Sequence, residues 1–384
     1  MKILQVVPFF SPVHGGSAIV PYYLSRELTK RGHEVAVFTS DYKLSRKWTD
    51  SLGNIEVYSF KAWSSWAKFY FTPTLIKIAK DKIKNFDLVH MHNYRTFQNI
   101  VVFHYAKKYG VPCVLQAHGS LPRIMARQRL KQVYDVLFGY RLFKGVSKVI
   151  ALSWVEAEQY KSMGVPDEKI AIIPNGIDLS EYADLAPKGS FKKKVGVKRN
   201  QRIVLYLGRI HKTKGIDFLI EAYALLIKDS RFHDVTLVIA GPNDGYLSEA
   251  RTLTNALGVS NRVLFTGFLN EYEKVSALCD SSIVVSPEKF NVFLIVPLEA
   301  AALGKPVIVS NTNYISHIVR EGKFGFSVDY GNTKELAEKM GKLLGNSNFT
   351  IDMSQNGRSF VSKNFNWNKI ISSFEKVYKD VIEN

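Results

Sequence analysis

Alternating strand and helix patterns are the feature that most constrains how this 384-residue chain can fold. A β-rich run at residues 3–7 is followed by a loop, a helical pattern over 18–31 and a second strand pattern at 33–39. Further strand-like runs occur at 88–91, 113–117 and 148–152. Strands that alternate with helices on this scale indicate βαβ units and therefore a parallel sheet.

The same alternation begins again after residue 200. Strand-like runs occur at 202–207, 235–240, 263–266, 283–286 and 306–310, with helical stretches at 218–227, 247–258 and 298–303. Because a chain of this length can bury two cores, we predict an α/β protein with two domains, each built on a parallel sheet. We expect the domains to be residues 1–183 and 201–364. Residues 184–200, with Pro187, Gly189 and three consecutive lysines, are the expected linker.

The end of the chain, residues 365–384, has the apolar stripe of an amphipathic helix. The stripe consists of Ile370, Ile371, Phe374, Val377, Tyr378 and Val381. We expect this helix either to pack on the second domain or to cross back to the first, and we favour the crossing.

The net charge of +18 is high and unevenly distributed. Residues 1–175 hold 25 Lys and Arg against 12 Asp and Glu, a net of +13, which leaves +5 for residues 176–384. Such a positive field attracts an anionic membrane, an acidic substrate or nucleic acid. Contents of 46% hydrophobic and 22% charged residues are typical of a soluble globular protein.

Several absences predict a cytoplasmic protein. Cys113 and Cys279 are the only cysteines and form no CxxC pair, which implies neither a metal cluster nor a disulfide framework. The first apolar run is too short for a signal peptide, and no run of about 18 apolar residues would span a bilayer.

Three charged residues in the second half have the character of a nucleotide-sugar site. Arg209 and Lys214 lie five residues apart just after the strand-like run at 202–207, and Glu299 lies near the start of a predicted helix. A cationic pair suits a diphosphate, and a carboxylate suits the two hydroxyls of a ribose. The alternatives are two surface cations on a loop and a first-turn glutamate that the helix dipole favours.

The first half offers further candidates. His118 follows an apolar strand and could contact a sugar hydroxyl, or it could be a structural loop histidine. Gly16 precedes a helix and permits close approach to an anion, although a plain turn would also need it. His90 and His92 form an H-x-H pair, but no third ligand has the right spacing, so we expect no metal site and favour structural or acceptor-contact roles.

Two basic and aromatic stretches, residues 61–84 and 123–148, predict contact with a membrane surface. Aromatic side chains beside cations suit the interface of a bilayer, although an amphipathic helix with a solvated charged face is the alternative. The residues that we expect to contact the membrane or the acceptor are Trp63, Trp66, Lys68, Arg123, Arg127 and Arg129.

Taken in order, the motifs of the chain resemble those of the retaining GT-B glycosyltransferases of family 4, along nearly its whole length. The resemblance is carried by Gly15-Gly16, Arg31-Gly32-His33-Glu34-Val35, His118-Gly119, Ile173-Pro174-Asn175-Gly176-Ile177-Asp178, Gly208-Arg209 with Lys214-Gly215, and Glu299-Ala300 with Gly304-Lys305-Pro306-Val307.

The resemblance implies a GT-B fold, in which two Rossmann-like doubly wound domains face a central cleft that holds a nucleotide sugar. It implies that Arg209 and Lys214 hold the donor diphosphate and that Glu299 holds the ribose. It further implies that His118 contacts the donor sugar and that Gly16 lies near the phosphates or the acceptor. The candidate catalytic residues are then His118, Arg209 and Lys214. Transfer in the family retains the anomeric configuration, commonly without a metal, so we expect no cofactor besides the UDP- or GDP-sugar substrate.

One segment departs from the family pattern. The family usually carries E-x7-E with Phe-Gly inside it, whereas this chain has Asn291 eight residues before Glu299, and Leu294 at the glycine. Asn291 and Leu294 are therefore expected at the donor sugar. Glu288 is the alternative source of the missing carboxylate, although it lies eleven residues before Glu299. An asparagine still donates and accepts hydrogen bonds but carries no charge.

These features lead to one main hypothesis, a transferase that extends a lipid-linked or cell-surface glycan at the cytoplasmic face of a membrane, to which it binds peripherally. The alternatives are a non-catalytic nucleotide-sugar-binding subunit of a partner transferase, and another GT-B class such as an epimerase or a phosphorylase. Nucleic acid is not an expected partner. The sequence names neither the donor sugar and its base, nor the acceptor, nor the oligomeric state.

Overall fold

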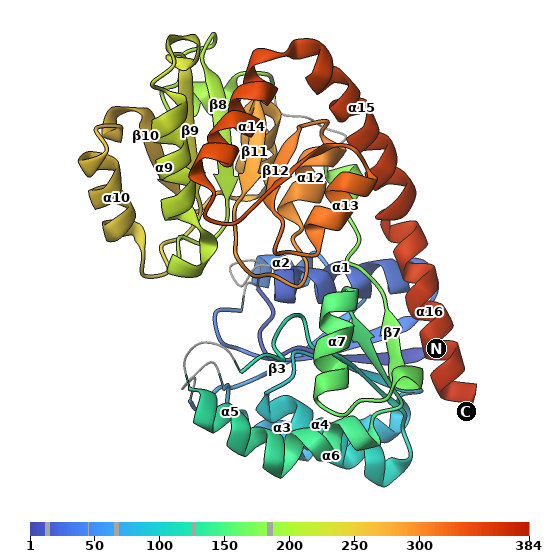
Figure 1. Cartoon of the computed structure of the whole chain (residues 1–384). Coiled ribbons are helices and arrows are strands. Elements are labelled where there is room, and N and C mark those ends of the chain that lie inside the picture. Colours follow the sequence, from blue (N-terminus) through green and yellow to red (C-terminus); the bar gives the residue numbers. More distant parts are fainter. Residues whose placement is uncertain (12–15, 45, 65–68, 124–126, 183–186, 384) are drawn as a thin grey trace. The chain divides into compact units, whose positions relative to one another are not determined.

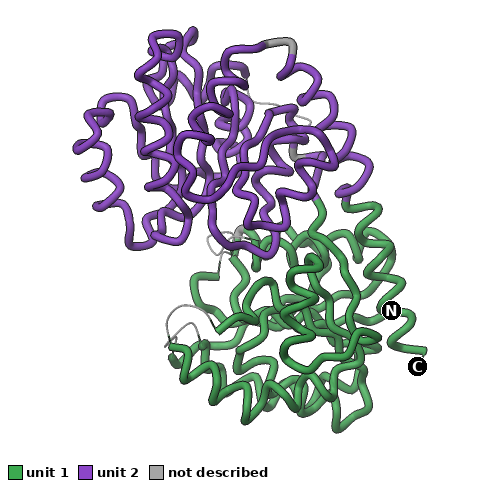
Figure 2. Tube along the Cα trace, in the orientation of Figure 1, with its two compact units in different colours: residues 1–176, 367–384 green, residues 177–366 purple. Residues whose placement is uncertain are grey.

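The computed structural model describes residues 1–11, 16–44, 46–64, 69–123, 127–182 and 187–383. The chain divides into two compact units (Figure 2). Unit 1 comprises Met1–Gly176 and Trp367–Asn384, and unit 2 comprises Ile177–Asn366.

Unit 1 is built on a seven-stranded sheet with the order β3-β2-β1-β4-β5-β6-β7, in which every pair of strands is parallel. The strands are β1 (Lys2–Val6), β2 (Glu34–Ser40), β3 (Glu56–Phe60), β4 (Leu88–His92), β5 (Cys113–Gln116), β6 (Lys148–Ala151) and β7 (Ile170–Ile172). The helices of this unit include α1 (Gly16–Lys30), α2 (Arg46–Asp50), α3 (Thr74–Lys82), α4 (Phe97–Tyr109), α5 (Gln128–Tyr134), α6 (Tyr140–Gly145), α7 (Trp154–Ser162) and α16 (Trp367–Glu383) (Figure 1).

Unit 2 repeats the plan with six parallel strands in the order β10-β9-β8-β11-β12-β13. These are β8 (Arg202–Leu207), β9 (Val235–Ala240), β10 (Val263–Gly267), β11 (Ile283–Ser286), β12 (Val307–Ser310) and β13 (Gly325–Val328). The helices include α8 (Ser190–Lys194), α9 (Ile216–Leu226), α10 (Leu247–Ala256), α11 (Glu271–Asp280), α12 (Val296–Ala302), α13 (Ile315–Glu321), α14 (Thr333–Gly345) and α15 (Ser347–Asn364). The prediction of two Rossmann-like α/β folds is confirmed, whereas β3, β7 and β13 were not predicted.

The expected linker, 184–200, has a different place in the structure. Its described part belongs to unit 2, where it forms the short helix α8. The buried carboxylate of Asp280 accepts hydrogen bonds from the backbone N–H groups of Gly189 (2.7 Å), Phe191 (2.9 Å) and Lys192 (3.1 Å). A carboxylate at a helix start satisfies N–H groups that have no partner within the helix, which explains why this segment is ordered.

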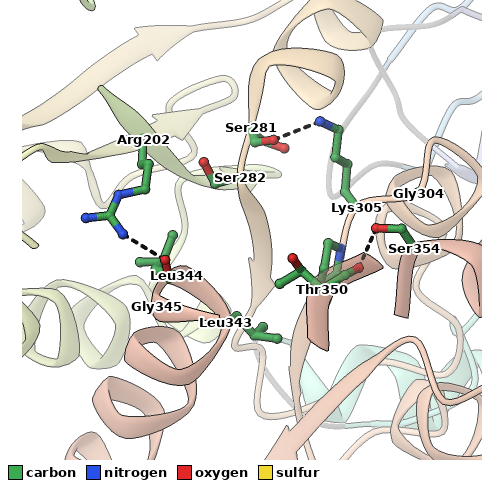
Figure 3. A pocket seen from close by; sticks show the side chains of 11 residues that line it. Arg202, Ser281, Ser282, Gly304, Lys305, Leu343, Leu344, Gly345, Thr350 and Ser354 are labelled. Atoms are coloured by element: carbon green, nitrogen blue, oxygen red, sulfur yellow. Dashed lines mark hydrogen bonds between the residues drawn. The ribbon is translucent and has the colours of Figure 1, made fainter. Parts of the chain in front are cut away.

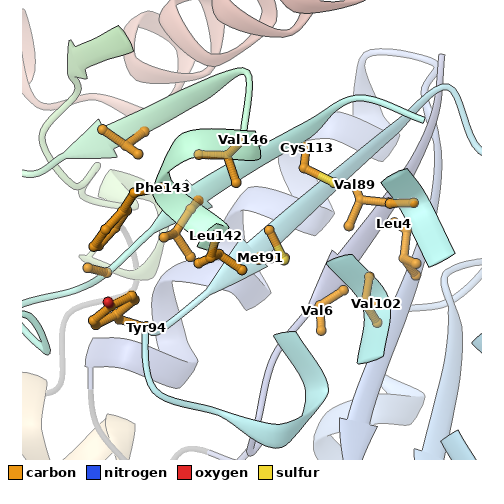
Figure 4. Close-up of a cluster of buried hydrophobic side chains, with 14 of the residues drawn as sticks. Leu4, Val6, Val89, Met91, Tyr94, Val102, Cys113, Leu142, Phe143 and Val146 are labelled. Carbon is orange, nitrogen blue, oxygen red and sulfur yellow. The ribbon is translucent and has the colours of Figure 1, made fainter. Parts of the chain in front are cut away.

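One large apolar cluster of unit 1 lies on one face of its sheet (Figure 4). Side chains alternate between the faces of a strand, so Leu4 and Val6 of β1 join Met91 of β4 in this core. Gln5 and His90, which pair in register between β1 and β4, point to the opposite face and are fully buried there. The sheet of unit 1 therefore has one apolar face and one partly polar face.

Helix α16 returns the end of the chain to unit 1, as we favoured from the sequence. Its apolar stripe is buried, including Phe374 and Tyr378, except for Val377, which is partly exposed. Glu375 accepts from Arg31 Nη1 at 2.7 Å and lies 2.9 Å from His33 Nε2, which ties the helix to the residues that follow α1. The Tyr378 hydroxyl lies 2.7 Å from His90 Nδ1, beneath the polar face of the sheet.

We predict that Phe374→Ala destabilises unit 1 by about 3–5 kcal/mol, because it removes a fully buried aromatic ring and leaves a cavity. Denaturant unfolding followed by circular dichroism measures the loss. Lys376→Ala, at an exposed position of the same helix, is the control and should change the free energy of unfolding by less than about 0.5 kcal/mol. Equal effects of the two substitutions would show that α16 contributes little to unit 1.

Candidate functional site

The loop after β8 carries the first candidate cation. Gly208 N donates to Ala240 O at 2.9 Å, and a Cβ on Gly241 would lie 1.8 Å from Gly208 O, so the loops after β8 and β9 meet at backbone distance. The Tyr206 hydroxyl donates to Arg209 O at 3.0 Å and fixes the turn. The half-exposed Arg209 side chain forms an ion pair with Asp244, a partner that the sequence did not suggest.

The Lys214 side chain is more buried than that of Arg209. It ends a short 3₁₀ turn, and Gly215 follows it with φ +66°. A Cβ on Gly215 would lie 2.5 Å from Pro287 O, so a glycine is required where this loop meets the segment after β11. Lys214 Nζ lies 3.7 Å from Glu288 Oε1, and only 14% of the lysine side chain is exposed.

Glu288 is the residue that this contact singles out. Its side chain is buried, and no hydrogen-bond partner reaches Oε2 within the described part of the chain. Burial raises the pKa of the carboxyl group, and the Lys214 ammonium opposes that rise. The structure thus places the Glu288 carboxylate beside Lys214, the candidate cation for the diphosphate. The family spacing favours a carboxylate at position 291 instead.

Asn291 and Leu294, the two residues that differ from the family pattern, follow in the same segment. Asn291 Oδ1 accepts from Phe293 N at 3.1 Å, a local turn that occupies the amide oxygen. The Leu294 side chain is buried. The predicted contacts of these two residues with a donor sugar remain predictions.

Glu299 lies in the first turn of α12, as expected from the sequence, and is buried. Its Oε1 accepts from Lys274 Nζ at 2.8 Å, and the same ammonium lies 2.6 Å from Glu271 Oε2. Burial alone would lower the pKa of Lys274, but the two carboxylates outweigh it and the pKa is raised. Lys274 stays charged and occupies one oxygen of Glu299.

The candidates Gly16 and His118 belong to unit 1, whereas Arg209, Lys214, Asn291, Leu294 and Glu299 belong to unit 2. Gly16 is the first residue of α1.

His118 follows β5 with φ +52°, and the next residue, Gly119, donates its N–H to Glu156 Oε1 at 2.5 Å. His118 Nε2 lies 2.8 Å from His92 Nδ1. Burial lowers the pKa of His118 to about 3, so its ring is neutral near pH 7.

The candidate membrane residues differ in their exposure and in their contacts. Trp63 is 68% exposed, but Trp66 and Lys68 lie outside the described residues. Arg123 Nε donates to Asp135 Oδ2 at 2.8 Å, and this buried carboxylate also binds Arg95, so part of the role of Arg123 is structural. Arg127 and Arg129, at the start of α5, are exposed.

An exposed apolar surface accompanies these arginines along α5, the π-helical turn Asp135–Gly139 and α6. We name it the α5–α6 face. Its side chains are 40–61% exposed and are those of Leu130, Val133, Val136, Leu137, Phe138 and Tyr140. Exposed apolar residues that gather in one place, rather than singly, are typical of an interaction surface.

A hollow of about 410 Å³ in unit 2 lies at the other edge of the sheet, near the amino ends of β8, β11 and β12 (Figure 3). Arg202, Ser282 and Lys305 are among its lining residues. Lys305 Nζ is already bonded to the carbonyls of Cys279 (2.6 Å) and Ser281 (3.0 Å). Open α/β sheets bind ligands at the carboxyl ends of their strands, so the loops after β8 and β11 are the better candidate.

Two protein-family models match the chain in sequence. The model described as Glycosyltransferase Family 4 matches residues 14–181, and the model described as Glycosyl transferases group 1 matches residues 187–360. An Escherichia coli enzyme, UDP-Gal:α-D-GlcNAc-diphosphoundecaprenol α-1,3-galactosyltransferase, is 28% identical over 82% of this chain and 84% of its own length. N-acetyl-α-D-glucosaminyl L-malate synthase of Bacillus anthracis is 24% identical over 97% of this chain and 95% of its own.

Solved structures show the same fold. Anabaena HepE, crystallised in complex with UDP-glucose, superposes with a TM-score of 0.81 at 21% identity and covers 99% of this chain and 100% of its own. The chain therefore belongs to the family 4 glycosyltransferases of the GT-B fold. None of the helices in the described part of the chain combines the length and apolar character that a bilayer crossing requires.

The neutral histidines of unit 1 predict a pH dependence. Burial lowers the pKa values of His90, His92 and His118, so unfolded chains bind protons below about pH 6.5 that the folded chain does not. Stability should therefore fall as the pH falls below 6.5, by about 1.4 kcal/mol per pH unit for each histidine. Glu156 acts in the opposite sense, because burial raises the pKa of its carboxyl group to about 7. The free energy of unfolding contributed by this group therefore falls as the pH rises from about 4.5 to 7.

A difference measurement isolates the histidine contribution. Between pH 5 and 6, His92→Gln should reduce the pH slope of the free energy of unfolding by about 1.4 kcal/mol per pH unit. His104→Gln, on an exposed position of α4, is the matched control and should leave the slope unchanged. If His92→Gln also leaves the slope unchanged, His92 is not held neutral in the folded chain.

Proposed function

We propose that this glycosyltransferase moves a sugar, with retention of anomeric configuration, from a UDP- or GDP-sugar to a lipid-linked or cell-surface glycan at the cytoplasmic face of a membrane. The observation that carries the proposal is the loop after β8, where Lys214 is held beside buried Glu288 and Arg209 is presented with Asp244. The name of the Escherichia coli relative, which specifies UDP-Gal and a diphosphoundecaprenol-linked acceptor, supports this class of donor and acceptor.

In this proposal the two cations stabilise the departing nucleoside diphosphate, because fixed charges aimed at developing negative charge lower the barrier. The bond from the anomeric carbon to the phosphate oxygen breaks, and the bond to the acceptor oxygen forms on the same face of the sugar. The proton of the acceptor hydroxyl passes to the departing phosphate oxygen. The reaction needs no metal on this account, so activity should persist after exhaustive treatment with a chelator.

Glu299 and His118 orient the donor. One oxygen of Glu299 is bonded to Lys274, so the other oxygen accepts hydrogen bonds from the ribose hydroxyls. His118 contacts the donor sugar, and Gly16 allows close approach of the phosphates or the acceptor. Each of these assignments follows from the residue's chemistry together with the family resemblance.

We also propose that Asn291 faces the donor sugar. Since its amide oxygen is bonded to Phe293 N, the amide nitrogen is the group that would donate to a sugar hydroxyl. Asn291→Glu should then change donor preference or rate while leaving nucleoside-diphosphate affinity nearly intact. If the parent chain binds nucleotide but transfers from no donor, the reading as a non-catalytic subunit holds instead.

We predict that Lys214→Ala weakens donor binding by about 1.5–3 kcal/mol, roughly 10- to 150-fold, because it removes a charge-assisted hydrogen bond to the diphosphate. Calorimetry with UDP, GDP and their sugars measures the change. Lys212→Ala, an exposed lysine in the same turn, is the matched control and should have little effect.

A double variant separates donor binding from stability. Lys214→Ala leaves Glu288 buried without its cation, which costs stability. Adding Glu288→Gln removes that charge and should restore stability but not donor affinity. Unchanged affinity in both Lys214→Ala and Arg209→Ala would overturn the diphosphate assignment.

We further predict reversible membrane binding through the α5–α6 face. Its exposed apolar side chains and the adjacent Arg127 and Arg129 suit an anionic interface, where each cation contributes about 1 kcal/mol. Co-sedimentation with liposomes should rise with the fraction of anionic lipid and fall with salt, which screens charge.

Paired substitutions test the surface itself. Leu137→Ser should reduce co-sedimentation, because the exposed leucine enters the interface. Ile351→Ser in unit 2, where the side chain is also 52% exposed, is the matched control and should have no effect. Equal binding by both variants, or binding that ignores lipid charge and salt, would contradict the assignment.

A further inference from the structure

The polar face of the unit 1 sheet holds an unusual buried layer. Gln5, His90, His92 and Gln116 are all fully buried, and the register places Gln5 beside His90 and His92 beside Gln116. Their neighbours along the same strands form the apolar core on the other face (Figure 4). Burying polar side chains costs free energy unless they are hydrogen-bonded, so the hydrogen bonds within this layer offset part of its cost.

Two contacts join two of these residues, Gln5 and His92, to His118 in a chain. His92 Nε2 lies 2.5 Å from Gln5 Oε1, and His92 Nδ1 lies 2.8 Å from His118 Nε2. Both nitrogens of His92 are thus engaged. The backbone around His118 is fixed as well, because Glu156 accepts the N–H of Gly119 at 2.5 Å. We call Gln5, His92 and His118 the histidine relay.

The contacts of the histidine relay define which ring nitrogen of each histidine carries the proton. Burial lowers the pKa values of His92 and His118, so both rings are neutral, and a neutral imidazole has one N–H donor and one acceptor nitrogen. A carbonyl oxygen only accepts, so the contact with Gln5 Oε1 requires the proton of His92 on Nε2. His92 Nδ1 then accepts, and His118 Nε2 must carry the proton that it donates.

We infer that Gln5 and His92 are positioning residues that hold His118 in the Nε2-protonated tautomer, so that His118 Nδ1 is an acceptor for a hydroxyl of the donor sugar. The ligand in this inference rests on the proposed function, whereas the tautomer rests only on contacts within unit 1. A neutral ring with its proton engaged by His92 does not protonate a substrate. Its role is to select a sugar that presents a hydroxyl at this point.

The tautomer is measurable without any substrate. Two-bond ¹H–¹⁵N correlation spectra of the full chain labelled at histidine distinguish a protonated from an unprotonated ring nitrogen, and His118→Gln assigns the signals. We expect Nε2 of His118 to be protonated and Nδ1 unprotonated near pH 7. The opposite pattern, with the proton on Nδ1, would overturn the inference.

Variants of Gln5 test what sets the tautomer. Gln5→Met removes the acceptor at nearly the same side-chain length, so His118 should become a mixture of tautomers, whereas Gln5→Glu keeps an oxygen acceptor and should retain the Nε2-protonated form. Gln98→Met is the matched control: Gln98 is equally buried in unit 1 but bonds to Tyr70 O and Thr72 Oγ1 outside the relay, and its replacement should leave His118 unchanged. A pure Nε2-protonated His118 in Gln5→Met would show that Gln5 does not position it.

Fluorinated nucleotide sugars test the ligand separately. Fluorine cannot donate a hydrogen bond, so replacing the contacted hydroxyl should weaken binding to the parent chain roughly two- to tenfold and should matter less in Gln5→Met. Equal affinity for every fluorinated position would remove the sugar contact. If no nucleotide sugar binds at all, the proposed function fails, while the tautomer spectra still decide whether the relay exists.

Discussion

Parallel pairing of the strands is the constraint on which the rest of this structure depends, because all strands of a parallel sheet end at the same edge. In unit 2 this brings the loop after β8, with Arg209 and Lys214, against the segment after β11, with Glu288. In unit 1 it brings His92 at the end of β4 beside His118 just after β5. Each unit therefore gathers its chemistry at the carboxyl edge of its sheet, where open α/β folds bind ligands.

Burial then decides which charged groups have a partner. Glu288, Glu299 and Asp135 are all buried, and each has a cation nearby, at Lys214, Lys274 and Arg95 respectively. A carboxylate in such a place is costly without compensation, so these pairs hold side chains in fixed positions. The same ion pairs position Lys214 for a diphosphate and Glu299 for a ribose. They therefore link the stability of unit 2 to its proposed donor site.

The periodicity of the sequence was sufficient for the plan of the fold and for the stripe of α16, because both depend on residues close together in the chain. It missed β3 and β7, which lie at the two edges of the unit 1 sheet, because Glu56 and Ser59 interrupt the apolar pattern of β3 and β7 is only three residues long. It also took 184–200 for a linker, because nothing local reveals that Asp280, some 90 residues later, caps α8.

The sequence by itself determined the residue types of the candidate site and their places after strands, since motif spacing and strand ends can be read along the chain. Only the tertiary structure decided their partners: Asp244 for Arg209, Glu288 for Lys214, Lys274 for Glu299, and Gln5 with His92 for His118. These partners come from separate loops and elements of the fold. Which of them meet depends on strand order and register, because hydrogen bonds and ion pairs form only between groups that the fold brings within a few ångströms.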